Sequence, residues 1–487
     1  MLSDVVPALR REKMSTVDTA WLRMDSDANL MMIVAVLMFD RPMDMRRFRH
    51  AIQTRLLTYQ RFRSAVVQDM TGGAWWQEQE VNLDEHVRRV SLNPATVCNK
   101  AELEQMVSEL SATPLDFSRP LWQMHLVDNC IGEDGQIRQA LIVRIHHCIA
   151  DGIALVGVLL SMFDRTAAAD EGPASEDAAP RAPITLDEDN PWLQLMQPVT
   201  KSTITAINLS ANIWTKYLWM VADSNRLVGR VARMGDMAGR FTLDAIKLAT
   251  MQEDSRTRLK GKPNGAKHVA WSEPLPLDEI KIIGKELGGS VNDVLMASVA
   301  GAIGAYLRAK GDAVPLNSDL RVMVPVNLRK AGEEKKLGNA FGLVPLVLPI
   351  GIEDPLKRLN EVKRRMDELK GSYQAIVAMT LLGVLGATPK QLQNEVQNFF
   401  TKKATAVMSN VPGPQSPLYL AGSQLDQIMF WVPQSGDIGV GVSILSYNGS
   451  VQFGLVTDSA VASDPQEIIN RFAPEFEKLV LLALMSA

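Results

Sequence analysis

The sequence has few of the residues from which disulfide frameworks and metal sites are built. Its 487 residues include only three cysteines and six histidines. The cysteines, Cys98, Cys130 and Cys148, lie far apart and form no CxxC pair. This count and spacing argue against a disulfide framework and a structural zinc site, and they fit a reducing compartment.

Long hydrophobic runs are also missing. The longest are Leu30–Phe39, Ala375–Ala387 and Leu479–Met485, and all are shorter than the roughly 20 residues that cross a bilayer. The N-terminal stretch MLSDVVPALRREKMS carries charge where a secretory signal needs its apolar segment. We therefore expect a soluble or peripheral protein and not an integral membrane protein.

The composition sets the broad class of the protein. Apolar residues make up 46% and charged residues 22% of the chain, as in ordinary globular proteins. The formal net charge of −4 gives no reason to expect nucleic acid as a partner. The length exceeds that of one ordinary core, so two domains are expected.

One acidic segment divides the chain. Residues 164–190 contain eight acidic residues and two arginines, with many Ala and Pro and almost no large apolar side chain. Such a segment cannot bury enough surface to order itself and is typical of an exposed linker. We expect an N-terminal lobe over 1–163, a connection over 164–265 and a C-terminal lobe over 266–487.

The second part of the connection is basic and amphipathic. Between Arg226 and Lys262 there are nine Lys or Arg and four Asp or Glu. In 191–262, apolar residues recur at helical spacing, namely at Ile207, Ala211, Trp214, Leu218 and Val221. Such a stripe either packs on the core of the protein itself or lies on an anionic lipid surface, and the two readings are compatible.

Both flanking regions mix strands and helices, which predicts an α/β (α+β) fold of two lobes. A hairpin is predicted at Asn448-Gly449, a strong turn signal between two strand-like runs. The strands are expected at 29–40, 123–128, 139–145, 321–326, 343–350, 438–445 and 450–457. The helices are expected at 46–58, 100–110, 153–163, 291–306 and 465–484.

The most informative segment is His-His-Cys-Ile-Ala-Asp-Gly at residues 146–152. It joins an apolar strand, 140–145, to an apolar helix, and such turns project side chains from a rigid scaffold. Histidine suits general base catalysis because its ordinary pKa of about 6.5 lies near operating pH. A structural or metal-bound His pair is the alternative, although no third ligand stands at a usual spacing.

The run His146–Gly152 matches the HHxxxDG signature of the CoA-dependent acyltransferase superfamily. Further motifs narrow the resemblance to the bacterial wax ester synthase/acyl-CoA:diacylglycerol acyltransferases. This resemblance extends over nearly the whole chain. Residues 14–33 resemble the segment with which proteins of this family open. VNLDEHVRRVSLN at 81–93 resembles the family's Asp-x-x-His-Val-Arg segment. The remaining matches are PLW at Pro120-Leu121-Trp122, ND at Asn292-Asp293 and NVPGP at residues 410–414.

The resemblance implies two chloramphenicol-acetyltransferase-like lobes in a pseudo-symmetric arrangement with a tunnel between them. It implies His147 as the catalytic base, supported by His146, with Asp151 and Gly152 shaping the motif. In related enzymes the motif aspartate pairs with an arginine, and Arg329 is the expected partner of Asp151. No cofactor is expected, because acyl-CoA is a co-substrate, and no metal is expected, because no third ligand stands at a usual spacing.

The expected reaction is direct transfer of a long-chain acyl group from acyl-CoA to a fatty alcohol or diacylglycerol, without an acyl-enzyme. No GxSxG elbow is present, and Cys148 is interpreted as a small packing residue that could also line the tunnel. Asn292 and Asp293 either cap a helix or help to shape the site. Pro120, Leu121 and Trp122 are candidates to line the tunnel, and Trp122 either lines it or fills the core.

Three other functions stay open on the sequence. A condensation-type enzyme would take its acyl group from a carrier protein, a hydrolase would use the same histidine without an alcohol, and a lipid-inclusion coat protein would not be catalytic. For the acyltransferase, we expect a cytoplasmic location with peripheral contact with the inner membrane or lipid inclusions.

Overall fold

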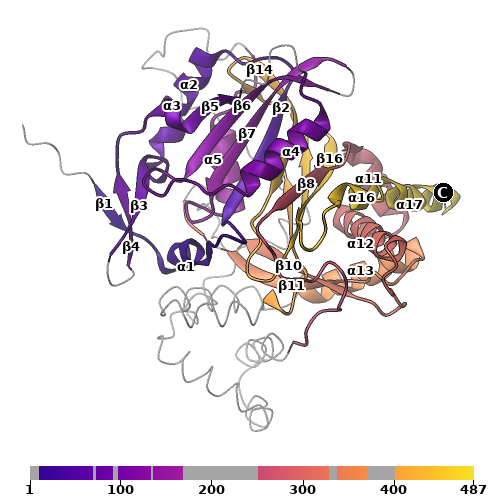
Figure 1. Cartoon of the computed structure of the whole chain (residues 1–487). Coiled ribbons are helices and arrows are strands. Elements are labelled where there is room, and N and C mark those ends of the chain that lie inside the picture. Colours follow the sequence, from indigo (N-terminus) through magenta and orange to yellow (C-terminus); the bar gives the residue numbers. More distant parts are fainter. Residues whose placement is uncertain are drawn as a thin grey trace, which may run out of the picture.

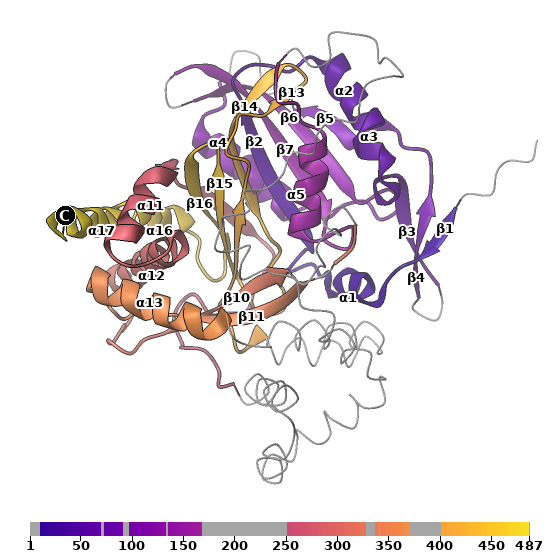
Figure 2. The same ribbon diagram turned by 180° about the vertical axis from the view of Figure 1, so that it is seen from behind.

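Two mixed α/β lobes stand side by side in the computed structural model (Figure 1). The N-terminal lobe lies around one sheet and the C-terminal lobe around another, and the same division is visible from behind (Figure 2). The structure describes residues 10–69, 73–90, 97–132, 135–167, 251–327, 337–339, 341–370 and 401–486.

The sheet of the N-terminal lobe has six strands in the described residues, and its central strand β7 ends at His146. All neighbouring pairs are antiparallel except β5 and β6. In order across the sheet, the strands are β13 (Tyr419–Leu420), β14 (Ser423–Trp431), β2 (Met32–Phe39), β7 (Ile137–His146), β6 (Trp122–Ile131) and β5 (Val87–Val90).

Helices cover both faces of this sheet. Helix α4 (Lys100–Ser111) lies on the face seen in Figure 1, and α5 (Gly152–Ser161) lies on the face seen in Figure 2. Every residue of β2 is buried, as expected for a strand that is covered on both faces. The other elements of this lobe are β1 (Arg11–Lys13), α1 (Thr16–Met24), α2 (Met45–Thr54), η1 (Leu56–Thr58), η2 (Gln60–Arg63), β3 (Ser64–Gln68), β4 (Ala74–Glu78) and α3 (Leu83–His86).

The sheet of the C-terminal lobe is mixed, and its helices pack against one face, where α12 (Val291–Ala309) is almost entirely buried. Its strands are β11 (Phe341–Leu348), β10 (Leu320–Asn327), β12 (Ala406–Pro412), β15 (Val440–Tyr447), β16 (Ser450–Asp458), β8 (Lys267–Trp271) and the short β9 (Leu275–Pro276). Its other helices are α11 (Leu277–Glu286), α13 (Pro355–Lys370), α16 (Pro465–Ile469) and α17 (Phe472–Ser486).

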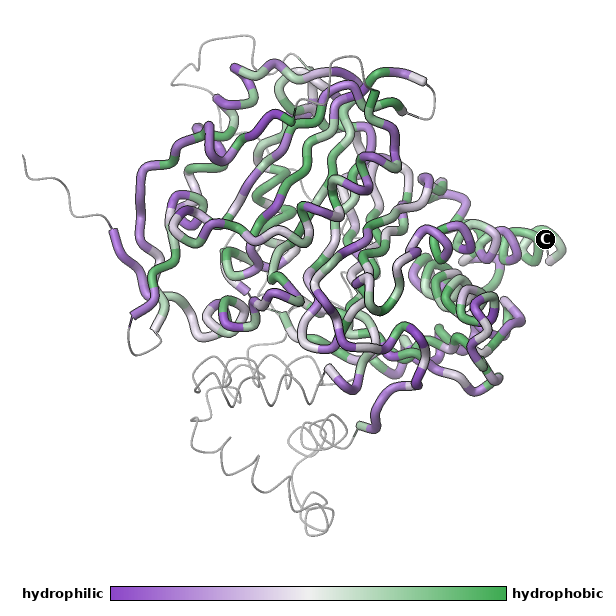
Figure 3. Tube along the Cα trace, viewed as in Figure 1, coloured by the Kyte–Doolittle hydropathy of each residue, from purple (hydrophilic) through white to green (hydrophobic). Residues whose placement is uncertain are grey.

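The predicted fold class and strands are confirmed. The hairpin of β15 and β16 turns at Asn448 and Gly449, whose φ angles of 49° and 79° are those of the favoured two-residue hairpin turn. Apolar residues are concentrated in the strands and in α12 (Figure 3). No single helix among those described is long and apolar enough to cross a membrane; α11 and α12 qualify only as a pair that bends by 96°.

Two predicted helices were wrong in their extent. The helix expected over 46–58 ends at Thr54 and continues as the 3-10 turn η1. The helix expected over 465–484 is broken into α16 and α17 near Asn470. Across the end of α2 the apolar periodicity continues, so the pattern did not reveal the break. Within 465–484 the break precedes Pro474, which is tolerated only in the first turn of a helix and so marks the start of α17.

The lobes do not separate along the chain as the sequence suggested. Strands β13 and β14 belong to residues 266–487 but complete the N-terminal sheet, with β14 paired along β2. The end of the predicted connection is packed into the C-terminal lobe, where buried Asp254 accepts a hydrogen bond from the Thr405 hydroxyl at 2.6 Å. The amphipathic stripe and Arg329 lie outside the described residues.

Candidate functional site

The two histidines lie where β7 meets α5. His146 is the last residue of the strand, and its backbone N–H donates to the Leu121 carbonyl at 2.9 Å. The backbone N–H of His147 donates to the Met31 carbonyl at 2.7 Å. Both imidazoles are buried. The PLW motif and the HHxxxDG motif therefore meet at one end of the N-terminal sheet.

Aromatic rings surround His147. Trp21 of α1 stacks on the imidazole with ring centroids 4.3 Å apart, and Phe341 of β11 lies 5.5 Å away. Burial lowers the pKa of His147 to about 4, although the nearby Asp151 carboxylate opposes this shift. The environment therefore keeps His147 neutral at ordinary pH.

His146 is fixed by a hydrogen bond at each ring nitrogen. Its Nδ1 accepts from the backbone N–H of Cys148 at 3.1 Å, so the ring proton belongs on Nε2. Nε2 lies 2.8 Å from Oδ2 of Asp25 and donates to it. The bond from Cys148 occupies the Nδ1 lone pair, so the hydrogen-bond pattern fixes the His146 ring in the tautomer with its proton on Nε2.

Asp151 and Gly152 begin helix α5. The Asp151 side chain accepts from the Ala154 backbone N–H at 3.1 Å, as N-cap of the helix. The Asp151 backbone N–H donates to the Gly338 carbonyl at 3.3 Å, so the C-terminal lobe contacts the motif directly. The expected pairing of Asp151 with Arg329 stays a prediction, because Arg329 lies outside the described residues.

A second contact from the C-terminal lobe reaches His147. The Asn339 side-chain amide donates to the His147 carbonyl at 2.9 Å and to Asp18 of α1 at 2.8 Å. Asp18 is also paired with Arg61 at 3.0 Å, and Arg61 donates to the Ile149 carbonyl at 2.6 Å. These groups hold the backbone of the motif from both sides.

Five residues around the histidines were not identified from the sequence as site residues, namely Asp18, Trp21, Asp25, Arg61 and Asn339. The family resemblance included residues 14–33, so the first three stood inside a quoted motif without an assigned role. Asn339 is 192 positions from His147, and nothing in its own neighbourhood signalled this contact.

The tunnel candidates are buried. Trp122 donates from its indole nitrogen to the Phe62 carbonyl at 2.7 Å and stacks on His86 at 4.3 Å, which is the placement of a core residue. Pro120, Leu121 and Cys148 are buried as well. Burial also raises the pKa of the Cys148 thiol well above its ordinary value.

The ND and NVPGP motifs meet in the C-terminal lobe. Asp293 forms a capping box with Ser290 at the start of α12. Asn410 of β12 donates from its side chain to Oδ1 of Asn292 at 3.2 Å. Asp293 thus has the predicted capping role, and Asn292 links the two motifs.

Within the described residues, no group of three or more His, Cys, Asp or Glu has an arrangement that could hold a metal ion. The motif itself offers a neutral, buried imidazole on a rigid turn, beside a second imidazole whose proton is fixed on Nε2. Such an arrangement can accept a proton from a substrate hydroxyl.

Similar solved structures have the same fold. A wax ester synthase/diacylglycerol acyltransferase from Marinobacter aquaeolei VT8 superposes with a TM-score of 0.65 at 21% identity, covering 97% of this chain and 99% of that one. The first condensation domain of the CDA synthetase superposes with a TM-score of 0.58 at 15% identity, covering 97% and 96%.

Sequence relatives lead to the same group. A Mycobacterium tuberculosis H37Rv protein named as a diacylglycerol O-acyltransferase is 28% identical over 424 residues, 84% of this chain and 77% of that one. A second, from the same strain and named for the same activity, is 23% identical over 482 residues, 96% of each chain. The wax ester synthase/diacylglycerol acyltransferase catalytic domain matches residues 14–295, and the C-terminal domain of that family matches 337–480. The chain belongs to the wax ester synthase/diacylglycerol acyltransferase family.

Proposed function

We propose that this protein transfers a long-chain acyl group from acyl-CoA to the hydroxyl of a fatty alcohol, a diacylglycerol or both, with His147 as the general base. The observation that carries the proposal is the pair of histidines. One imidazole is neutral and buried, and the other is fixed in a single tautomer by Asp25 and the Cys148 backbone.

The proposed reaction is one addition followed by one elimination. The alcohol oxygen attacks the thioester carbonyl carbon while its proton moves to His147. A tetrahedral oxyanion forms, and its collapse breaks the carbon–sulfur bond. The departing CoA thiolate takes the proton from the imidazolium, so the ester and free CoA leave and His147 is neutral again.

The low pKa of His147 is compatible with this role. Burial penalises the imidazolium, which keeps the base in its proton-accepting form. During the reaction a negative oxyanion develops beside the imidazolium. Opposite charges at close range favour the charged form of each, so the base becomes stronger as the transition state is approached.

His146 has the supporting role in this proposal. Its Nδ1 already accepts a hydrogen bond, so it cannot serve as a base without a change in the turn. The same proposal gives supporting roles to Gly152, Asn292 and Asp293. It also includes a substrate tunnel lined by Pro120, Leu121, Trp122 and Cys148. Peripheral contact with the inner membrane or lipid inclusions, where long-chain acceptors are found, belongs to it as well.

A product assay tests the proposal. Labelled palmitoyl-CoA is offered together with hexadecanol and a diacylglycerol, and wax ester and triacylglycerol are separated and counted. We expect at least one ester from the wild type, a loss of several orders of magnitude in His147→Ala, and a smaller loss in His146→Ala. Both variants should keep the circular dichroism spectrum of the wild type.

Three outcomes would contradict the proposal. Near-normal turnover by folded His147→Ala would show that His147 is not the general base. Ester formed only from palmitoyl-acyl-carrier protein would indicate a condensation-type enzyme. Release of free CoA at the same rate with and without alcohol would indicate a hydrolase.

A further inference from the structure

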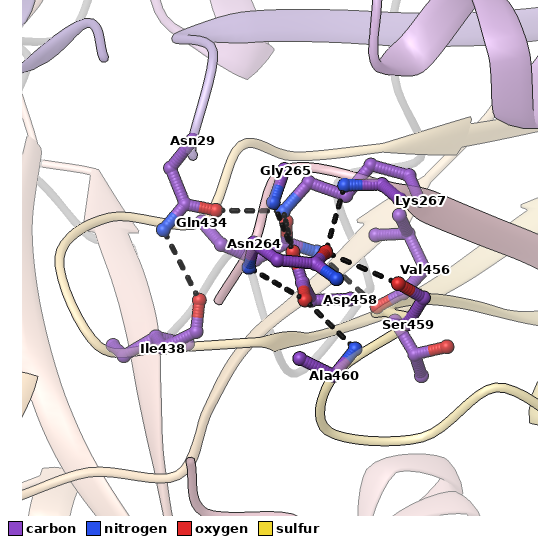
Figure 4. A network of polar contacts seen from close by, with 12 residues as sticks. Asn29, Asn264, Gly265, Lys267, Gln434, Ile438, Val456, Asp458, Ser459 and Ala460 are labelled. Atoms are coloured by element: carbon purple, nitrogen blue, oxygen red, sulfur yellow. Dashed lines mark hydrogen bonds and ion pairs between the residues drawn. The ribbon is translucent and has the colours of Figure 1, made fainter. Parts of the chain in front are cut away.

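A buried polar network joins the two lobes (Figure 4). Asn29 extends from the N-terminal lobe, and its side chain is 1% exposed. Its Oδ1 accepts from the Lys267 ammonium at 2.8 Å. Its Nδ2 donates to the Gly436 carbonyl at 2.8 Å and the Ile438 carbonyl at 3.4 Å. One side chain thus contacts two separate segments of the other lobe.

Asp458 anchors the network in the C-terminal lobe. This carboxylate is fully buried at the end of β16 and lies 3.3 Å from the Lys267 ammonium. It also accepts from the backbone N–H groups of Asn264, Gly265 and Ala460, at 2.9, 2.9 and 3.1 Å. A buried carboxylate with this many donors is held firmly, so Lys267 presents its ammonium to Asn29 from a fixed position.

On the other side, Asn29 closes a tight turn. Its backbone N–H donates to the Ser26 carbonyl at 3.0 Å, and the Ser26 N–H donates back to the Asn29 carbonyl at 3.2 Å. Gly265 lies against this turn: a Cβ there would be 2.5 Å from the Asp27 carbonyl oxygen. The C-terminal lobe therefore holds the turn both by hydrogen bonds and by direct contact.

The turn is flanked by two groups that touch the histidines. Asp25, immediately before it, accepts from His146 Nε2 at 2.8 Å. Met31, two residues after Asn29, accepts from the His147 backbone N–H at 2.7 Å. Asp25 Oδ2 also accepts from the Met31 N–H at 3.3 Å, which ties the two ends together.

We propose that Asn29, held by Lys267 and Asp458, is a positioning residue that sets Asp25 and Met31 against the two histidines, so that the catalytic geometry depends on the contact between the lobes. Asn29 acts through Asp25 and the Met31 carbonyl and does not touch the reacting atoms. The part of this inference that concerns catalysis rests on the proposed function, whereas the part that concerns the His146 ring does not.

The chain offers a matched control at the far end of β2. Ser423 is 1% exposed and donates from its hydroxyl to the Pro42 carbonyl at 3.1 Å, so it also joins the C-terminal half to the N-terminal lobe through a buried hydrogen bond. Strand β2 has Met32 opposite His146 at one end and Phe39 opposite Leu425 at the other. Seven steps of about 3.3 Å separate these two ends.

The experiment compares Asn29→Ala with Ser423→Ala in the full chain. The first readout is kcat and KM for ester formation, and we expect kcat of Asn29→Ala to fall about tenfold or more because small misplacements of catalytic groups are costly. KM should change much less. Ser423→Ala should keep both constants near those of the wild type while its thermal midpoint falls by a similar amount.

The second readout is the nitrogen spectrum of the imidazoles, which is practical because the chain has six histidines. His146 should give the signal of the tautomer with its proton on Nε2 in the wild type and in Ser423→Ala. In Asn29→Ala that signal should shift or broaden. Asn29→Gln, which keeps the amide but lengthens the side chain, should give intermediate behaviour.

The outcomes separate the two proposals. If folded Asn29→Ala keeps both the wild-type kcat and the wild-type His146 signal, Asn29 is only structural and the inference is overturned. The same holds if Ser423→Ala loses kcat equally. If the wild type makes no ester but the His146 signal responds to Asn29→Ala and not to Ser423→Ala, the proposed function fails while the positioning role stands.

Discussion

His147 is a histidine whose surroundings oppose its protonation. Its ring stacks on Trp21 and is buried, and burial is the main reason that its pKa falls to about 4. Burial removes the water that a charged ring would need, and the nearby Asp151 carboxylate offsets only part of that cost. The low pKa of His147 therefore affects both the rate of ester formation and the stability of the folded protein as pH is lowered.

The first prediction is that the acid limb of the rate profile lies near pH 4 and not near pH 6.5. The base is active when neutral, so kcat/KM for the alcohol, measured at saturating acyl-CoA, should fall only as pH approaches the pKa of about 4. An inflection near pH 6.5 would show that His147 titrates as an ordinary exposed histidine and would contradict the prediction.

The same pKa shift acts on folding. The folded-state pKa of about 4 is below the ordinary 6.5, so the unfolded chain binds this proton more readily. The contribution of His147 to stability is therefore complete above pH 6.5 and is lost as pH falls toward 4. His125, whose pKa is also lowered to about 4, behaves alike. The difference between wild type and His147→Gln in urea unfolding at several pH values isolates the part due to His147.

The second prediction concerns Cys148. This thiol is fully buried, and burial raises its pKa, so it is a poor nucleophile. Cys148→Ala should keep kcat within a few-fold of the wild type and lose about 1 kcal/mol of stability from the small cavity. Loss of activity in a folded variant, or a covalent acyl group trapped on Cys148 and found by mass spectrometry, would instead support an acyl-enzyme.

At the scale of single residues, the sequence identified the proposed reacting groups better than the side chains that hold them in place. His146, His147 and Asp151 follow one another in a motif whose chemistry can be read locally. Trp21 and Asn339 reach His147 from α1 and from the other lobe. Which distant side chain fills such a place depends on packing between elements, which a local pattern does not record.

At the scale of the elements, strands with a clear hydrophobic pattern and a turn signal were predictable. Strand β2 and the hairpin of β15 and β16 are examples, because burial and the Asn448-Gly449 turn leave direct marks in the sequence. The end of α2 was not, since the apolar spacing runs across it. The break between α16 and α17 does leave a mark, Pro474, because proline is tolerated only in the first turn of a helix. The partner of β14 was not predictable either, because strand pairing is a long-range choice.

The third prediction concerns Gly413 of the NVPGP motif, where the segment after β12 passes the carbonyl of Ser446 in β15. A Cβ at Gly413 would lie 2.3 Å from that backbone oxygen. Gly413→Ala should therefore cost about 1–3 kcal/mol in urea unfolding, as overpacking generally does. This result would show that the motif fixes the path of the backbone after β12.

The matched control is Gly157→Ala in α5. A Cβ there meets nothing within 4 Å, and the residue is exposed on a helix. Alanine is the better helix former by up to about 1 kcal/mol, so this variant should be as stable as the wild type or more stable. Equal behaviour of the two variants would show that the approach of Gly413 to Ser446 does not matter.

At the scale of the whole molecule, the C-terminal half of the chain supplies a strand to the sheet of the N-terminal lobe. Strand β14 belongs to the C-terminal half of the chain but pairs with β2 from Leu425 to Trp431. Trp431 in turn packs against Trp271 of the other sheet, with ring centroids 5.6 Å apart. Neither lobe is complete without the other, so the molecule should fold as one unit.

The fourth prediction follows from this shared strand. Residues 1–265 produced alone should be insoluble or aggregate, because the edge of β2 that pairs with β14 would be open. Coexpression with residues 266–487 should restore a soluble complex. The intact chain should unfold in one calorimetric transition whose van't Hoff and calorimetric enthalpies agree. A stable, monomeric 1–265 fragment with native circular dichroism would contradict this prediction.

The stack of Trp21 on His147 has an optical consequence. Indole emission is quenched by a protonated imidazole in contact with it, whereas a neutral imidazole quenches it far less. With centroids 4.3 Å apart, Trp21 is placed to report the charge of the His147 ring through its fluorescence. The difference in emission between the wild type and Trp21→Phe, followed as acid is added, gives the protonation state of His147 without a substrate and without isotopes.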